Sequence, residues 1–138
     1  MPKLTQATLT PEEVVREFFN SMGPTFDDTL NALHTFCAED CAWHNTGYPT
    51  AHGTAEMIAF LTKFREGLGF AAFRVDWGPV LSNGSLVMAE RMDYIYNEAG
   101  EELMSLKAMG AFEVREGKIV YWSDYWDTAP FKCPEQAS

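Results

Sequence analysis

The second half of the chain contains four long strand-like segments, separated by three short sequences that are typical of tight turns. The turns are Ser82-Asn83-Gly84, Glu98-Ala99-Gly100 and Glu116-Gly117. Glycine after a small or polar residue favours the tight connections of β-hairpins. We therefore expect four consecutive antiparallel strands with the sequences FRVDWGPVL, SLVMAERMDYIY, ELMSLKAMGAFEV and KIVYWSDYW. Two of them exceed the usual strand length, and long twisted strands curl, so the sheet should be strongly bent.

Three amphipathic helices are expected before these strands. Thr10-Pro11-Glu12-Glu13 has the form of an N-cap, a first-turn proline and a capping box, and Gly23-Pro24 should end that helix. Thr25 with Asp28 begins a second helix in the same way, and Thr54 is expected to cap a third. The residues expected to face the core are Val14, Val15, Phe18, Phe19 and Met22 in the first helix, Leu30, Leu33, Phe36 and Cys37 in the second, and Ile58, Leu61, Phe64 and Leu68 in the third.

Between the second and third helices, CAWHNTG (residues 41–47) is a candidate short strand. Helices followed by hairpin-linked strands predict one α+β domain over residues 1–138, with the tail 130–138 at its periphery. The sheet is expected to be antiparallel or mixed and cone-shaped, with the three helices covering its concave side. Hydrophobic residues make up 46% of the chain and aromatic residues 14%. The cone should therefore enclose a ring-lined pocket, the usual place for a small-molecule site.

Charge and cysteine content limit the partners and the compartment. The formal charge of −10 argues against nucleic acid and anionic membrane as partners, because both require a basic face. No apolar run is long enough to span a membrane, and the start MPKLTQATLT lacks the layout of a signal peptide. The odd number of cysteines predicts no closed disulfide framework, so a reducing, cytoplasmic setting is expected. Cys37, Cys41 and His44 lack a fourth ligand, which favours ordinary packing over a metal site.

Two of the strand segments carry charged residues among apolar ones. In SLVMAERMDYIY, the alternation of a strand places Arg91 and Asp93 side by side on one face. In VYWSDYWD, Asp124 shares a face with Trp122 and Trp126. An unpaired carboxylate among aromatic rings is costly. Asp124 therefore lies either at a solvent-exposed edge of the sheet or beside a buried group that pairs with its carboxylate.

If the last strands fold back beside the segment that carries Arg91, one guanidinium could lie between the two carboxylates and bind both at once. One carboxylate, kept ionised, could take a proton from water. The other, with a pKa raised by burial, could deliver a proton to a leaving oxygen. Burial and the arginine shift a carboxyl pKa in opposite directions, and the sequence leaves the balance open. A merely structural ion pair is the alternative.

Three short motifs resemble those of a known family. Glu90-Arg91-Met92-Asp93, Trp122-Ser123-Asp124-Tyr125 and Trp43-His44-Asn45 resemble sequences of the limonene-1,2-epoxide hydrolases. That family belongs to the nuclear-transport-factor-2-like (NTF2-like) superfamily of cone-shaped α+β domains. The order of elements is similar over nearly the whole chain.

The resemblance implies that a small or medium apolar epoxide is opened to a vicinal diol in one step. By matching position, Asp124 would be the general base and Asp93 the general acid, Arg91 would bridge the two acids, and Asn45 would position the water. The resemblance also implies that no metal or organic cofactor takes part, and that the protein forms a homodimer. An epoxide opens readily when its oxygen gains a proton while the nucleophile arrives from behind.

Trp43 departs from the family pattern, because the family has a water-holding tyrosine there. An indole donates a hydrogen bond but does not accept one, so Tyr48 in the following loop is a candidate replacement for the lost hydroxyl. We expect Trp43, Trp122, Tyr48 and Phe64 to contact the substrate. His44 should face away from its neighbours Trp43 and Asn45.

Two other kinds of function remain open at this stage. The same cone fold carries isomerases, cyclases and dehydratases of the polyketide or steroid type, which use one Asp or an Asp–His pair. A steroid-type isomerase would want a tyrosine near a lone Asp, and Arg91 argues against that arrangement. The protein could also be a non-catalytic small-molecule-binding module, in which the charged trio only stabilises the cavity.

Overall fold

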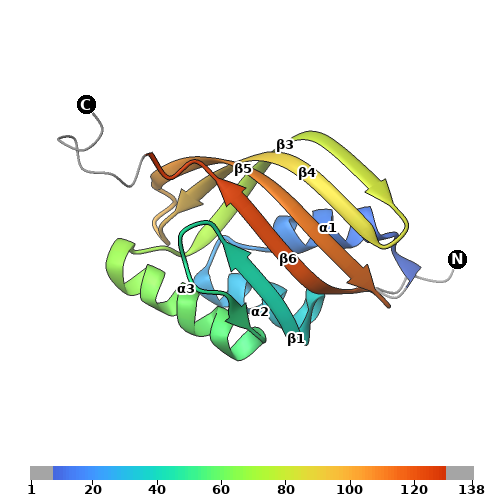
Figure 1. The fold of residues 1–138 in the computed structure, drawn as a ribbon. Helices are drawn as coiled ribbons and strands as arrows, with labels where there is room; N and C mark the ends of the chain where they lie inside the picture. The colour runs from blue at the N-terminus through green and yellow to red at the C-terminus, as the bar shows by residue number, and fades with distance from the viewer. Residues whose placement is uncertain (1–7, 130–138) are drawn as a thin grey trace, which may run out of the picture.

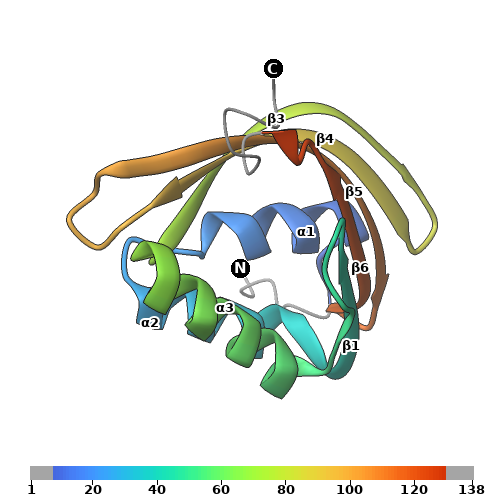
Figure 2. The same cartoon turned by 60° about the vertical axis from the view of Figure 1, so that its left-hand side comes forward.

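A curved sheet wraps around the first helix, and two further helices close its open side (Figure 1 and Figure 2). The structure is a computed structural model and describes residues 8–129. The predicted peripheral tail, 130–138, lies outside the described residues. Within them, the helices are α1 (Pro11–Asn20), α2 (Phe26–Phe36) and α3 (Thr54–Leu68), and the strands are β1 (Cys37–Asn45), β2 (Ala51–His52), β3 (Ala72–Asn83), β4 (Leu86–Tyr96), β5 (Glu102–Arg115) and β6 (Lys118–Trp126).

The strands form one mixed sheet in the order β2-β1-β6-β5-β4-β3. Strands β3 to β6 pair with their sequence neighbours in antiparallel fashion, as the turn sequences predict. Strand β1 lies parallel to β6, and β2 pairs antiparallel to β1 at the edge. Figure 2 shows the sheet arching over α1, with α2 and α3 on the opposite side of the enclosed space. The predicted α+β fold with a strongly curved sheet and three covering helices is confirmed.

The starts of α1 and α2 are capped as the sequence predicts. The Thr10 hydroxyl accepts a hydrogen bond from the Glu13 backbone N–H, and the Glu13 carboxylate accepts one from the Thr10 N–H. Thr25 and Asp28 make the same reciprocal pair at the start of α2. Each cap contributes roughly 1 kcal/mol to helix stability. These two caps define where α1 and α2 begin.

The prediction that Thr54 caps α3 is wrong. The N-cap is Gly53, which has φ of 87° and makes no side-chain cap, and Thr54 is the first helical residue. The Gly53 N–H donates to the Cys41 carbonyl at 2.7 Å, and a Cβ on Gly53 would lie 2.7 Å from the Glu39 carbonyl oxygen. Close backbone approach to β1 therefore determines where this helix begins, and a capping side chain does not.

Two further predictions need correction at the ends of α3 and β1. Leu68, expected in the core, is 43% exposed. Gly69 turns the chain with a left-handed conformation, and the fully buried Phe70 fills the core below the last turn of α3 instead. The strand predicted over residues 41–47 is longer and begins earlier, because β1 follows α2 directly at Cys37.

The inner face of the sheet carries both the core and the charged residues. In β4, Val87, Ala89, Arg91, Asp93 and Ile95 are all buried, while the alternate residues are partly or fully exposed. The alternation predicted for this strand is therefore confirmed. Among the described helices, none is both long and apolar enough to cross a membrane.

Candidate active site

One guanidinium binds two carboxylates on the inner face of the sheet. Arg91 Nε and Nη2 donate to Asp93 Oδ1 and Oδ2, each at 2.9 Å. Arg91 Nη1 and Nη2 donate to Asp124 Oδ1 and Oδ2, each at 3.0 Å. Both contacts are bidentate, the strongest geometry that an arginine makes with a carboxylate. The structure therefore brings together the three charged residues that the sequence singled out.

Strand order and small side chains make this arrangement possible. Arg91 lies on β4 and Asp124 on β6, with β5 between them. Arg91 is paired with Ala108 of β5, and Gly110 of β5 is paired with Asp124. Two strand spacings amount to roughly 9–10 Å, so the long arginine side chain must pass over β5. A Cβ on Gly110 would clash with Arg91 Nη1 and would lie 2.8 Å from Asp124 Oδ1. Only glycine leaves room for the guanidinium at this point.

The three charged groups are nearly excluded from water. Arg91 is 1% exposed, and Asp93 and Asp124 are each 6% exposed. The guanidinium carbon also lies 4.6 Å from the centroid of the Phe19 ring, which provides a cation–π contact from α1. Removing Arg91 would leave two buried acids without their cation, which costs far more than breaking a surface pair.

Burial and ion pairing shift the pKa values in this trio in opposite directions. Burial raises the pKa of Asp124, and the charge and hydrogen bonds of Arg91 offset only part of that rise. The Trp122 indole also lowers this pKa, and its Nε1 makes no hydrogen bond within the described residues. Burial also disfavours the charge on Arg91, but the two carboxylates outweigh it, so the pKa of Arg91 is raised and the guanidinium stays charged. The raised pKa makes Asp124 a stronger base than an ordinary aspartate.

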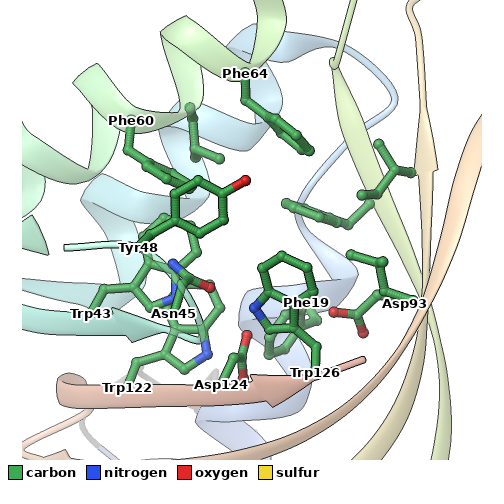
Figure 3. A pocket seen from close by; sticks show the side chains of 14 residues that line it. Phe19, Trp43, Asn45, Tyr48, Phe60, Phe64, Asp93, Trp122, Asp124 and Trp126 are labelled. Carbon is green, nitrogen blue, oxygen red and sulfur yellow. The ribbon is translucent and has the colours of Figure 1, made fainter. Parts of the chain in front are cut away.

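A small chamber lies directly above the two carboxylates. Its volume is about 50 Å³, and most of its wall is aromatic or aliphatic. Asp93 and Asp124 point into it from β4 and β6 (Figure 3). Arg91, which binds both of them, is not among the lining residues. A ligand in the chamber would therefore meet the carboxylates and not the guanidinium.

Asn45 lies next to Asp124 at the floor of the same chamber (Figure 3). The two residues are paired across the parallel strands β1 and β6. The backbone N–H and the hydroxyl of Thr46 each donate to the Asp124 carbonyl at 3.2 Å, which fixes this register. Within the described residues, no hydrogen bond to the Asn45 side-chain amide is found. The amide is therefore able to bind a small polar molecule beside the Asp124 carboxylate.

The aromatic residues predicted to contact a substrate also line the chamber, and these are Trp43, Trp122, Tyr48 and Phe64. Trp43 stacks on Trp122 with ring centroids 4.3 Å apart and an angle of 13° between the planes. Their indole Nε1 atoms are the two buried side-chain polar atoms without a hydrogen-bond partner among residues 8–129. Tyr48 is 45% exposed and packs on Phe60 and Trp126. It therefore lies at the mouth of the chamber.

Cys37, Cys41 and His44, which the sequence analysis considered as metal ligands, do not surround a common point. His44 faces away from the chamber, with its Nδ1 2.7 Å from the Thr50 hydroxyl and its ring against Tyr121. Cys37 and Cys41 are free and buried. A hydrogen bond with Cys41, together with burial, raises the pKa of Cys37, which disfavours the thiolate that a metal would need. In the part of the chain that the structure describes, no three His, Cys, Asp or Glu side chains are grouped to hold a metal ion.

Several residues of the site were not identified from the sequence. Gly110, which lies beneath the guanidinium rather than in the chamber wall, is the clearest case, and the two small residues Ala108 and Gly110 at alternate positions of β5 were the available signal. Phe19 was predicted to be in the core but not to lie beneath a guanidinium. Trp126 was placed on the same strand face as Asp124, yet its role as a chamber wall depends on how far the sheet bends.

The cone-shaped fold is shared with many solved structures of NTF2-like proteins. A putative SnoaL-like polyketide cyclase from Jannaschia sp. CCS1 has a TM-score of 0.70 at 13% identity, with 95% of this chain and 94% of that chain covered. The structure of an epoxide hydrolase from Mycobacterium tuberculosis that is described as similar to limonene-1,2-epoxide hydrolase has a TM-score of 0.66 at 24% identity. The match covers 92% of this chain and 86% of that chain. At these identities the similarity defines the fold class alone.

The sequence comparisons are more specific. The family model of the limonene-1,2-epoxide hydrolase catalytic domain matches residues 9–132, and the chain belongs to this family. Epoxide hydrolase EphG of Mycobacterium tuberculosis is 27% identical over 113 residues, which are 82% of this chain and 70% of that protein. Arg91, Asp93 and Asp124 all lie within residues 9–132, the region that the family model matches.

Proposed function

We propose that this protein is an epoxide hydrolase that opens a small or medium apolar epoxide to a vicinal diol by one-step attack of water. The observation that carries the proposal is the pair of carboxylates on one guanidinium, both facing an apolar chamber. An isolated buried acid could not supply both an acid and a base. Two acids that share one positive charge can hold a single proton between them without an unbalanced charge.

In the proposed reaction Asp124 is the general base and Asp93 the general acid. A water molecule held by the Asp124 carboxylate and the Asn45 side-chain oxygen attacks one epoxide carbon. Its proton passes to Asp124, the carbon–oxygen bond of the epoxide breaks, and the epoxide oxygen takes the proton of Asp93. The trio carries one proton before and after the step, so Arg91 balances the same charge throughout. Acid, base and bridging cation all come from the chain, so we propose that no cofactor takes part.

The chamber wall fits an apolar substrate. Trp43, Trp122, Tyr48 and Phe64 present rings to the space above the carboxylates. The Trp43 indole can donate to water but cannot accept its proton. Asp124 and Asn45 are therefore the proposed acceptors for the two protons of the attacking water. The Tyr48 hydroxyl is the candidate third partner, if its ring turns inward from the mouth.

The test is the hydrolysis of a racemic epoxide panel by the wild type, Asp93→Asn and Asp124→Asn. We expect diol from the wild type and a loss of about a hundredfold or more in kcat/KM for each variant, because general acid and general base each contribute about that much. Asp40→Asn, the same change at an exposed position of β1, is the matched control and should keep wild-type rates. Full activity in either Asn variant would refute the assigned roles.

A second candidate function is supported by the cyclase-like fold relatives, which include a second putative SnoaL-like polyketide cyclase with a TM-score of 0.71 at 14% identity. Such chemistry would need one base and no bridging arginine. Turnover of a ketosteroid or of a cyclisation substrate that persists after replacement of Arg91 would favour it over hydrolysis. Ligand binding without turnover on any panel would instead favour a binding module.

We also propose a homodimer and a cytoplasmic location. The outer face of β4, β5 and β6, opposite to the chamber, exposes Met88, Met109, Tyr121 and Tyr125, and Met109 and Tyr125 are direct cross-strand neighbours. Exposed apolar side chains that gather on one face of a sheet suit a protein interface. Sedimentation of the wild type against Met109→Glu tests the dimer, which the charge should dissociate. The free buried thiols of Cys37 and Cys41 fit a reducing compartment.

A further inference from the structure

The chamber above the carboxylates is too small for a whole substrate of ordinary size. Its volume is about 50 Å³, whereas pockets that enclose a drug-sized ligand measure about 300–1,000 Å³. A space of this size holds a few water molecules or the reacting end of a larger molecule. The remainder of a larger molecule must therefore lie elsewhere.

A groove of about 540 Å³ adjoins the chamber on its α3 side. One wall is the segment 48–51, and the other is the facing side of α3, with Glu56, Ala59 and Lys63. Tyr48, Phe60 and Phe64 line both spaces. Figure 3 shows these three rings on the α3 side of the chamber, across from Asp93 and Asp124. The groove and the chamber are therefore neighbouring compartments separated by three rings.

The three separating rings pack on one another, and each also packs on one further ring: Tyr48 on Trp126, Phe60 on Trp43 and Phe64 on Phe70. Tyr48 meets Phe60 edge to face at 5.3 Å, and Phe60 stacks on Phe64 at 6.4 Å. Tyr48 is 45% exposed, and Phe60 and Phe64 are only partly buried. A ring that is partly in water gives up only part of its packing when it changes rotamer. A chain of methylene groups can therefore pass between them and gain contact with their faces.

We propose that the substrate is an elongated epoxide: the epoxide, at or near one end, enters the chamber, while an apolar chain passes the three rings and lies in the groove. This inference rests on the proposed hydrolase function. It assigns the substrate class by length. Pro49, Ala51 and Ala59 line the groove but not the chamber, and their small apolar surfaces suit a chain better than a bulky ring system.

The test uses straight-chain terminal epoxides with four, six, eight and ten carbons, on the full-length protein. A methylene taken wholly out of water contributes about fourfold to binding. In a half-open groove we expect kcat/KM to rise roughly twofold per added methylene once the chain leaves the chamber. Ala59→Trp should fill the groove and lower the ratio of the ten-carbon to the four-carbon kcat/KM by about tenfold. Ala55→Trp, which is also exposed on α3 but lies outside both spaces, is the matched control and should keep that ratio.

The outcomes separate this inference from the proposed function. Diol from the short epoxides without any gain in kcat/KM for longer chains overturns the inference alone. A gain that survives in Ala59→Trp also overturns it, because the chain would then lie outside the groove. Absence of diol from every member of the series overturns the hydrolase function and this inference with it.

Discussion

Arg91 donates four hydrogen bonds to two carboxylates while it is almost wholly excluded from water. Replacing it with methionine keeps much of the side-chain volume but leaves two buried acids without their cation. We expect Arg91→Met to lower the free energy of unfolding by about 3–5 kcal/mol at neutral pH, measured by urea denaturation. The loss should shrink as the pH falls, because protonation neutralises the unpaired acids.

Arg115→Met is the matched control for that replacement. Arg115 also pairs with an acid, Glu113, at 2.9 Å, but its side chain is 68% exposed. Surface pairs contribute between nothing and about 1 kcal/mol, so this variant should unfold almost like the wild type. Equal losses in the two variants would show that the buried trio is not especially stabilising.

The raised pKa of Asp124 predicts a pH dependence of activity. The proposed base must be ionised, so activity should fall as the pH drops through the Asp124 pKa. Because burial outweighs the effect of Arg91 and raises this pKa, the acid limb of kcat/KM should have its midpoint above the ordinary aspartate value of 3.8. A limb centred at or below 3.8 would contradict the role of Asp124 as the base in this environment.

The raised pKa of Asp124 affects folding stability in the opposite direction from activity: activity needs the ionised carboxylate, whereas stability is greater with the protonated one. A carboxyl group whose pKa is higher in the folded than in the unfolded state favours folding when it is protonated. The contribution of Asp124 is therefore fully present below its unfolded pKa and is lost as the pH rises through its folded pKa. At neutral pH the ionised form costs folding free energy, which the hydrogen bonds from Arg91 partly offset.

At the scale of the elements, strand β5 determines whether the site can form. Gly110→Ala places a methyl group against Arg91 and Asp124. Such overpacking costs about 1–3 kcal/mol, and a displacement of about 1 Å in a reacting group lowers rates by up to a hundredfold. We expect kcat/KM to fall between about tenfold and a hundredfold, with a modest drop in melting temperature.

Gly67→Ala, in the last turn of α3, is the control for an added methyl group. Nothing lies within 4 Å of a Cβ at that position, and alanine favours a helix by up to about 1 kcal/mol over glycine. This variant should keep its activity and gain a little stability. Wild-type kinetics in Gly110→Ala would mean that the guanidinium does not depend on the gap in β5.

Elements defined by local chemistry were predictable from the sequence. The capping boxes at Thr10 and Thr25 and the three hairpin turns are encoded within a few residues, so their positions could be predicted. The N-cap of α3 at Gly53 was missed because it depends on a backbone hydrogen bond to Cys41 and a close approach to Glu39, both in β1. The parallel pairing of β1 with β6 is non-local in the same way, and it is what brings Asn45 beside Asp124.

At the scale of the whole molecule, the fold does not determine the chemistry. The two putative polyketide cyclases superpose on this chain with TM-scores of 0.70 and 0.71, slightly above the 0.66 of the epoxide hydrolase structure. One cone thus supports different reactions. We propose that the residues on its inner face, above all Arg91 between two acids, carry the distinction. Alternation along β4 and β6 made those residues predictable, whereas the chamber's volume depends on packed ring rotamers that no sequence pattern encodes.

The most direct measurement is a single turnover of an accepted epoxide in water enriched in heavy oxygen, with enzyme in excess over substrate. One-step attack by water predicts that the diol formed in this first turnover carries the label. If Asp124 attacked the epoxide itself, hydrolysis of the resulting ester would leave an unlabelled oxygen from the protein in the first diol. Unlabelled first-turnover diol would therefore contradict the account of Asp124 as a base acting through water.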